Sequence, residues 1–309
     1  MTTTERLALL FPGGGTQYPG MGKTLYDSSK MVKELFEEAN DILGFNLRRI
    51  CFEGTLSALS AMNIAQPAIF TVSLAAAKVW MQDTGIQPAF ACGHSLGELT
   101  ALTAAGVFSF EDALLLVHAR GMLLSEAGQQ LNAGMMAVNK APAGVVEAAC
   151  KALNSEGAQV YVAVYNSPLQ QVVAGNRDDM ALLANRLQAA GAETVLLQIN
   201  TPSHCPLMAT AGHRFRENIN ACTHGAFSFP VISNVTAAPY TADTDITDML
   251  TRHMTNPVRW ADSITYLAAQ DITTAVETPP QAVLKQLMPY ITPDISVYAL
   301  DVAEDLIKN

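Results

Sequence analysis

Ser95 lies in a pattern that is typical of a nucleophile elbow, Gly93-x-Ser95-x-Gly97. The apolar run 88–92 before it is expected to form a buried strand, and residues 99–105 after it are expected to form a helix. A serine on such a sharp turn needs glycines on both sides, because Cβ atoms there would clash with the neighbouring strand and helix. Its hydroxyl then stands clear of the sheet, beside amides at a helix N-terminus that stabilise negative charge. A chance match is the alternative, and the strand and helix around the motif argue against it.

A nucleophilic serine needs a base within hydrogen-bond reach, and histidine is the usual one. His94 directly precedes the serine, and neighbouring side chains on such a turn diverge, so we expect it to pack or to form a hydrogen bond instead. His204 is the strongest candidate, because Pro202 and Pro206 limit how its loop can be oriented. No aspartate after the serine stands out, so the residues favour a Ser-His dyad, oriented by a backbone carbonyl, over a triad. The other histidines considered are expected at the surface: His118, His213 and His224.

A glycine triplet, Gly13-Gly14-Gly15, follows the apolar run 6–11, which is expected to be a buried strand. A strand that leads into such a turn could be a phosphate loop. The chain has neither Gly-Lys-Ser/Thr here nor a GxGxxG pattern followed by an acidic ribose ligand, which argues against nucleotide binding. Two interpretations stay open at this point: the glycines let backbone amides approach a reacting oxygen, or they form a plain tight turn.

Arg120 is the only arginine between Arg49 and Arg177. In a long apolar stretch it is either a charge at a helix C-terminus or a buried ligand for a carboxylate, and the residues alone favour the first. Gln66 stands just before the expected start of a helix at 68–80, where it could cap that helix or point into a cleft.

The composition is that of a globular protein with a large core, since 50% of the 309 residues are hydrophobic and 15% are charged. A net charge of −10 without a Lys/Arg cluster argues against a nucleic-acid surface. Five cysteines without CxxC spacing indicate reduced thiols, with no zinc site or disulfide framework. Residues 2–6 do not resemble a signal peptide and the apolar run 7–11 is too short to span a membrane, so we expect a cytoplasmic protein that is not bound to a membrane.

Residues 133–200 follow the order βαββαβ, which is typical of a ferredoxin-like unit. The expected strands are 135–138, 160–165, 171–174 and 194–199, and the expected helices are 143–153 and 178–190. This predicts a small subdomain at 133–200, inserted into a larger α/β domain formed by 1–132 and 201–309. Further expected elements are helices 26–43, 207–221 and 282–287, strands 229–234 and 272–276, a loop at 253–260, and an exposed acidic segment around Asp243, Asp245 and Asp248.

Eight motifs occur in order along nearly the whole chain: Phe11–Gln17, Gln66-Pro67, Gly93–Glu98, Arg120-Gly121, Asn166–Gly175, His204, Val231–Asn234 and Asn256–Trp260. Together they resemble the malonyl-CoA:acyl-carrier-protein transacylases and the acyltransferases of polyketide synthases. The resemblance implies an α/β-hydrolase-like domain with a ferredoxin-like insert, in agreement with the pattern above.

The resemblance also implies how the acyl group is carried. Ser95 would be the nucleophile that holds it as an ester, and His204 the base that also activates the pantetheine thiol of an acyl carrier protein. A backbone carbonyl at His253 would hold the histidine ring. The oxyanion amides would be those of Gly14 and Leu96.

The same resemblance implies a substrate pocket. Arg120 would bind the free carboxylate of a malonyl-type acyl group, with Gln66, Asn166, His94 and Ser203 as further substrate-binding residues. The expected partners are an acyl carrier protein and malonyl-CoA or a related acyl thioester. No metal or redox cofactor is expected, since coenzyme A or phosphopantetheine enters as part of the substrate.

Two of the three departures from the family pattern bear on the pathway and the substrate. The usual Gly-Gln-Gly is Gly13–Gly15 here, and the small Ser203 before the histidine leaves room for a methyl-, hydroxy- or aminomalonyl unit. A free-standing acyltransferase of a polyketide assembly line is favoured over one of fatty-acid synthesis. A hydrolase that releases acyl groups from carrier proteins with the same dyad is the alternative, against which Arg120 argues, because neutral acyl chains need no guanidinium. The intact dyad argues against a docking scaffold without activity.

Overall fold

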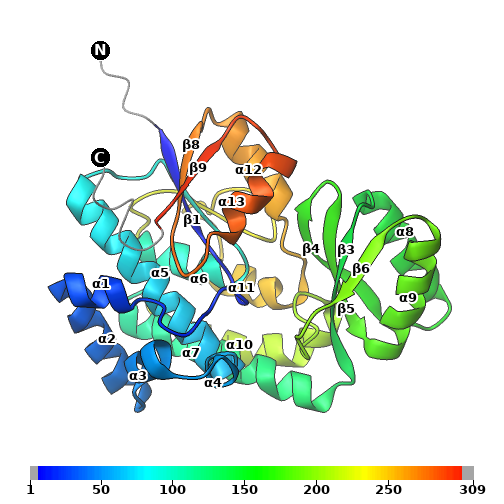
Figure 1. Ribbon diagram of the computed structural model, residues 1–309, viewed down its shortest axis with the longest axis horizontal. Helices are drawn as coiled ribbons and strands as arrows, with labels where there is room; N and C mark the ends of the chain where they lie inside the picture. Colours follow the sequence, from blue (N-terminus) through cyan, green and yellow to red (C-terminus); the bar gives the residue numbers. More distant parts are fainter. Residues whose placement is uncertain (1–5, 301–309) are drawn as a thin grey trace.

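Two sheets organise the chain in the computed structural model, which describes residues 6–300 (Figure 1). The larger sheet has the order β7-β2-β1-β8-β9, and every neighbouring pair is parallel. Its strands are β1 (Leu7–Phe11), β2 (Phe90–Gly93), β7 (Val231–Ile232), β8 (Thr274–Glu277) and β9 (Ser296–Ala299). The central strand β1 is apolar throughout because both of its faces are covered, as is usual in parallel sheets.

Helices cover both faces of this sheet. Leu9 and Phe11 of β1 point into one core, which is shared with helices α5 (Met62–Thr84), α6 (Leu96–Ala104) and α7 (Phe110–Gln130). The alternate residues of β1 point into a second core. Helices α12 (Trp260–Ala269) and α13 (Val283–Leu287) pack there. Helix α5 is long and apolar enough to cross a membrane, but 83% of its apolar window is buried inside the protein, which makes it a core helix.

The second sheet is antiparallel, with the order β4-β5-β3-β6. Its strands are β3 (Ala133–Asn139), β4 (Val160–Ser167), β5 (Gln170–Asn176) and β6 (Glu193–Leu196). Helices α8 (Ala143–Ser155) and α9 (Arg177–Ala189) form a separate core on one face of it. The other face packs against Val258 and Trp260 of the larger unit. The expected α/β architecture and the βαββαβ order are confirmed.

Several expected elements differ in their bounds. The helix expected at 26–43 is two helices, α1 (Lys23–Ser28) and α2 (Lys30–Leu43), because Ser29 is extended and its side chain caps α2. Strand β7 has two residues where six were expected. The helix expected at 207–221 is a short 3₁₀ turn (Pro206–Met208) followed by α10 (Ala209–Asn220).

Other elements were not expected at all. The acidic segment and the expected loop at 253–260 contain helix α11 (Ile246–Thr255), whose N-terminus is capped by the Asp245 side chain through the amide of Asp248. His253 therefore lies in the last turn of a helix rather than in a loop. Strand β9 and helices α3 (Leu47–Glu53), α4 (Leu56–Leu59) and α12 were also missed.

Candidate active site

Ser95 stands on the turn between β2 and α6, with φ 53° and ψ −110°. A Cβ on Gly93 would clash with the backbone of Gly97, and a Cβ on Gly97 would clash with the carbonyl of Phe11. The strand, turn and helix expected around the serine are therefore present, with the steric reason for both glycines. The turn lies at the carboxyl end of β2, where open parallel sheets place their ligands.

The hydroxyl of Ser95 faces His204. The distance from Ser95 Oγ to His204 Nε2 is 2.7 Å, and His204 Nδ1 lies 2.9 Å from the carbonyl oxygen of His253. Because a carbonyl only accepts, Nδ1 carries the hydrogen and Nε2 is free to accept the proton of the serine. His204 has φ 62°, a left-handed conformation that is rare for residues with a Cβ. Burial, and then the charge of Arg120, lowers the pKa of His204 to about 3, so the ring is neutral at neutral pH.

Arg120 also reaches the serine, from the interior of helix α7. Its Nη2 lies 3.2 Å from Ser95 Oγ, and its Nη1 donates to Gln66 Oε1 at 2.6 Å. Arg120 is 2% exposed and, among residues 6–300, has no carboxylate within ion-pair distance. Burial lowers its pKa to about 10, against the opposing effect of Glu98, so it stays charged at neutral pH. The interpretation of Arg120 as a charge at a helix C-terminus is wrong.

Gln66 and Arg120 meet because helices α5 and α7 pack closely. Gly121 makes this possible, since a Cβ there would clash with the carbonyl of Met62 at the start of α5. Gln66 is the fifth residue of α5 rather than a residue before it, and Pro67 lies inside the helix. The expectation that a helix starts at 68 was wrong because a full turn, 62–65, precedes the proline. Pro67 has no amide hydrogen for the carbonyl of Asn63, and Nδ1 of His118 lies 3.0 Å from that carbonyl oxygen instead.

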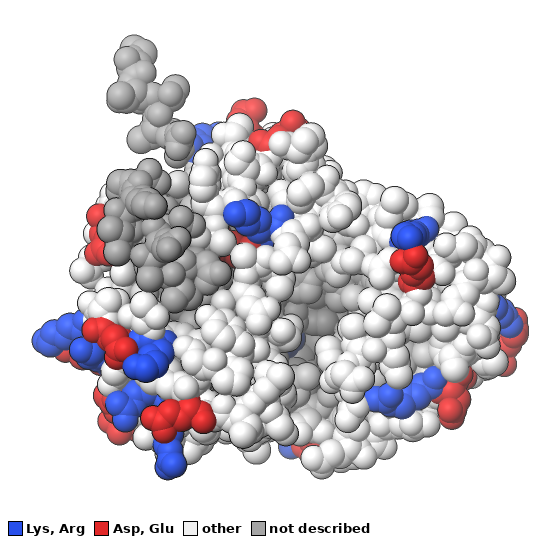
Figure 2. All heavy atoms as spheres, viewed as in Figure 1, with Lys and Arg blue, Asp and Glu red and all other residues white. Residues whose placement is uncertain are grey.

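A cavity of about 630 Å³ opens at this point, between the large unit and the antiparallel sheet. Its polar lining includes Gly14, Gln66, Ser95, Arg120, Ser203 and His204. Its apolar wall includes Met62, Leu124, Met135, Val164, Val172 and Ile199. Figure 2 shows a hollow on this face of the molecule, where the visible surface carries few charged side chains. An apolar cavity with a few convergent polar groups is typical of a small-molecule site.

The glycine triplet forms one edge of that cavity. The turn is held by Thr16, whose hydroxyl donates to the carbonyl of Gly13 at 2.9 Å. Gly13 has no room for a Cβ beside the carbonyl of His94, whereas a Cβ on Gly14 would meet only the Gln66 side chain at 3.8 Å. Leu96 is the first residue of α6, so its amide lies at a helix N-terminus, where amide hydrogens lack helical partners.

His94 does not act on the serine hydroxyl. Its Nε2 lies 2.9 Å from Asn166 Oδ1, and Asn166 in turn donates to Gln170 Oε1 at 3.2 Å. Although it also borders the cavity, His94 thus ties the turn before Ser95 to strand β4 of the smaller unit. Asn166 was expected to line the substrate pocket, but it is not among the residues that line this cavity.

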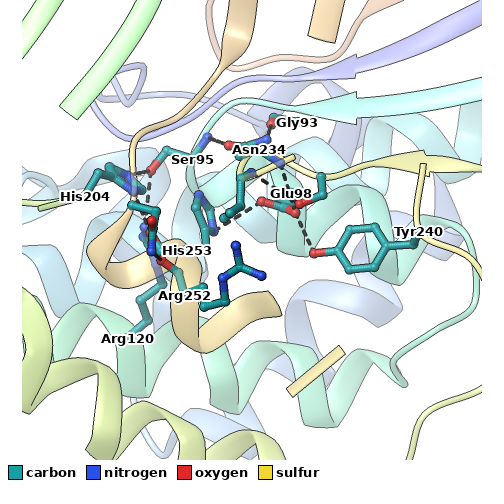
Figure 3. A network of polar contacts seen from close by, with 12 residues as sticks. Gly93, Ser95, Glu98, Arg120, His204, Asn234, Tyr240, Arg252 and His253 are labelled. Carbon is teal, nitrogen blue, oxygen red and sulfur yellow. Dashed lines mark hydrogen bonds and ion pairs between the residues drawn. The ribbon is translucent and has the colours of Figure 1, made fainter. Parts of the chain in front are cut away.

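A buried network behind the serine was missed by the sequence analysis (Figure 3). Asn234, after β7, accepts from the amide of Ser95 at 2.8 Å and donates to the carbonyl of Gly93 at 2.6 Å. Glu98 is fully buried and accepts from the amide of Asn234 at 3.2 Å and from the hydroxyl of Tyr240 at 2.6 Å. Both Glu98 and Asn234 lie in motifs on which the resemblance rests. Acidic residues are common in the first turn of a helix because they interact favourably with the helix dipole, so Glu98 did not stand out in the sequence.

Among residues 6–300, no group of three or more His, Cys, Asp or Glu side chains could hold a metal ion. The five cysteines are free, and four of them are buried. Two other histidines have contacts of their own: His118 contacts the carbonyl of Asn63, and His224 packs on Phe108.

Known proteins are similar to this chain over almost its full length. The model of the acyl transferase domain family matches residues 8–296. A malonyl CoA-acyl carrier protein transacylase of Bacillus subtilis is 38% identical over 302 residues, which cover 98% of this chain and 76% of that protein. The malonyl CoA-acyl carrier protein transacylase of Escherichia coli strain K12 is 36% identical over 297 residues, 96% of each chain.

A solved structure is also similar. It is that of a type II polyketide synthase acyl-carrier protein in complex with its malonyl-transacylase, with a TM-score of 0.94, 32% identity and coverage of 98% of both chains. The resemblance inferred from the ordered motifs is therefore confirmed. Because the family model spans most of the chain and these relatives match it over almost its full length, the chain belongs to the acyl transferase domain family.

Proposed function

We propose that this enzyme moves a malonyl-type acyl group from a thioester onto the phosphopantetheine thiol of an acyl carrier protein, through an ester on Ser95. The observation that carries the proposal is the position of Arg120. The buried guanidinium has no acidic partner among residues 6–300 and lies 3.2 Å from the hydroxyl of Ser95, in the same cavity. Such a group binds a carboxylate, and a malonyl-type unit keeps a free carboxylate when its other end forms the ester.

In the first half of the reaction, Nε2 of His204 takes the proton of Ser95 while Oγ attacks the thioester carbonyl. The amides of Gly14 and Leu96 donate to the oxyanion of the tetrahedral intermediate. The intermediate collapses, the C–S bond breaks, and the leaving thiolate receives the proton from His204. Ser95 then carries the acyl group as an ester.

In the second half, the thiol of the carrier protein gives its proton to His204 and attacks the ester carbonyl. The same amides stabilise the second oxyanion, and the proton returns to Oγ of Ser95 as the C–O bond breaks. The carbonyl of His253 holds the ring of His204 in the tautomer that both halves require. His204 supplies both acid and base, so the proposed reaction needs no metal or redox cofactor.

The comparisons support the acceptor and the pathway. The similar proteins are named malonyl CoA-acyl carrier protein transacylases, and the similar structure is a complex of such an enzyme with an acyl carrier protein of a polyketide synthase. We therefore assign the chain to fatty-acid or polyketide synthesis. We also place it in the cytoplasm, as its free thiols favour.

The test is intact-protein mass spectrometry after a brief incubation with malonyl-, methylmalonyl-, acetyl- or hexanoyl-CoA. We expect a malonyl-sized adduct that is absent from Ser95→Ala and that disappears when a holo acyl carrier protein is added, with the carrier protein gaining the same mass. Adducts from neutral acyl groups alone would contradict the proposal, as would loss of the malonyl group to water when the carrier protein is present.

A further inference from the structure

Glu98 is a fully buried carboxyl group that takes no part in the proposed reaction. Its Oε1 accepts the hydrogen bonds from Tyr240 and Asn234, but its Oε2 accepts no hydrogen bond from the described residues. The polar atom beside Oε2 is Nδ1 of His253, at 3.2 Å. His253 is itself 2% exposed, and its Nε2 has no hydrogen-bond partner within residues 6–300. Two buried titratable side chains thus face each other directly behind the dyad (Figure 3).

His253 contacts His204 in two ways. Its carbonyl oxygen lies 2.9 Å from His204 Nδ1, and its imidazole ring packs on the ring of His204, with 4.8 Å between centroids and 33° between planes. Glu98 is in the first turn of the helix that Ser95 begins, and its amide donates to the carbonyl of Ser95 at 3.1 Å. The contacts therefore form a closed loop from Ser95 through Glu98, His253 and His204 back to Ser95.

The charges around this pair come from several elements. Among the described residues, the groups whose charge affects the pKa of His253 are His204, Arg120 and His94. The titratable groups that interact electrostatically with Glu98 are Tyr240, Cys92 and Arg120. Burial raises the pKa of Glu98 to about 7. Burial, followed by the electrostatic effects of His204 and Arg120, lowers the pKa of His253 well below its usual range. Burying a carboxyl group costs free energy unless the group is well paired. The burial of Glu98 therefore indicates a role besides packing.

We propose that Glu98 is a positioning residue, which fixes the ring and backbone of His253 and, through them, the distance between His204 and Ser95. The inference rests on the Ser-His dyad of the proposed function, but not on the identity of the acyl group. Because Glu98 and Ser95 share one helical turn, the contact between α6 and α11 holds the nucleophile and the base at a fixed distance from each other.

The experiment measures how fast phenylmethanesulfonyl fluoride modifies Ser95, and what fraction of the molecules is modified, in Glu98→Gln, His253→Leu and the double variant. Glu98→Gln keeps the acceptor for Tyr240 and the shape of the side chain, and His253→Leu keeps the carbonyl. We expect each single variant to lose about tenfold in rate, as small misplacements of reacting groups do, with the modified fraction unchanged. The double variant should be no slower than the slower single one, because both break the same link.

Two further variants serve as controls. His253→Gln keeps the carbonyl and supplies an N–H to Glu98, so it should recover most of the rate that His253→Leu loses. Glu277→Gln alters another buried carboxyl group, which accepts from the amides of Leu284 and Lys285 and does not contact the dyad, and it should leave the rate unchanged.

Additive losses of rate in the double variant would overturn the proposal. So would a smaller modified fraction in which the molecules that still react do so at the original rate, because a purely structural role predicts that result. The outcome is separate from that of the proposed function. A protein that is sulfonylated on Ser95 but takes no malonyl group contradicts the function and still tests the positioning.

Discussion

The guanidinium of Arg120 and the hydroxyl of Ser95 lie 3.2 Å apart, although the two residues come from different helices. A fixed positive charge therefore stands at hydrogen-bond distance from the atom that would carry the acyl group. The length of a malonyl unit, from its ester carbonyl to its free carboxylate, has to fit between these two groups. This relationship makes Arg120 the residue on which acyl selection can be tested most directly.

Replacing Arg120 with Ala should remove most malonyl transfer while sparing neutral acyl groups. Hydrogen bonds to a charged group contribute about 1.5–3 kcal/mol each, so the loss of a bidentate pair predicts a fall in kcat/KM for malonyl-CoA of about a hundredfold or more. We expect some gain in acetyl or hexanoyl loading, or in hydrolysis. Steady-state kinetics with each acyl-CoA checks this. Arg120→Lys is the control variant that keeps the positive charge but lacks the paired N–H donors of the guanidinium. Unchanged malonyl kinetics in Arg120→Ala would remove the carboxylate assignment.

Ser95→Gly and Ser95→Ala should both abolish acylation, yet differ in stability. The φ of 53° with ψ of −110° is strained for a residue with a Cβ and accessible to glycine. Strain of this kind costs about 1–3 kcal/mol, so Ser95→Gly should have the higher free energy of unfolding of the two, after the greater chain entropy of glycine is subtracted. Denaturant titration of both variants measures the difference. Equal stabilities would show that the turn is not strained.

Gly97→Ala should destabilise the protein, because the new Cβ would clash with the carbonyl of Phe11 in β1. Overpacking of this kind costs about 1–3 kcal/mol or more, and movement of α6 would also displace the amide of Leu96. The matched control is Gly144→Ala in helix α8, where nothing lies within 4 Å of the added Cβ and alanine is the better helix former. We expect a lower melting temperature for the first variant and an equal or higher one for the second. The reverse order would contradict the steric account of the elbow.

The rate of Ser95 modification should stay nearly constant between pH 7.5 and pH 5. A base loses activity as it becomes protonated, and burial and Arg120 lower the pKa of His204 to about 3, so the loss should come only as the pH approaches that value. An ordinary histidine pKa of about 6.5 would instead lower the rate about thirtyfold at pH 5. Sulfonylation rates across this range distinguish the two. In Arg120→Met, the pH at which the modification rate falls to half should be higher, because a positive charge beside His204 has been removed. If that pH is unchanged, burial alone sets the pKa of His204.

The stability of the protein should also respond to His204. An unfolded histidine binds a proton below about pH 6.5, whereas the buried ring does so only near pH 3, so this group lowers the stability as the pH falls from 6.5 to 3. His204→Gln should make the free energy of unfolding less dependent on pH in that window. Denaturant titrations at pH 6.5 and pH 4.5 measure the change, and an identical slope in both proteins would contradict it.

Several features could be predicted from the sequence because they depend on neighbouring residues. The elbow follows from backbone sterics within five residues, 93–97, and a buried parallel strand such as 7–11 needs only a continuous apolar run. The βαββαβ unit follows from the periodicity of 133–200. The helix that holds His253 was missed because its acidic first turn suggested a solvated segment, whereas Asp245 is its N-terminal cap.

Other features depend on which distant residues come into contact. Ser95 and His204 are 109 positions apart, and Ser95 and Asn234 are 139 positions apart. Ser95 and Asn234 meet because strands β2 and β7 are neighbours in the sheet, so the loops at their carboxyl ends converge. His204 instead follows strand β6 of the smaller unit, and the carbonyl of His253 in α11 holds its ring beside the serine. The residues around Arg120 gave no sign that its side chain would meet Gln66 rather than solvent, since that contact requires α5 and α7 to approach at Gly121. The sequence by itself thus determined the local geometry of the nucleophile, through sterics and periodicity. Only the tertiary structure decided which charges and hydrogen bonds surround it, because those contacts arise from packing between elements far apart in the chain.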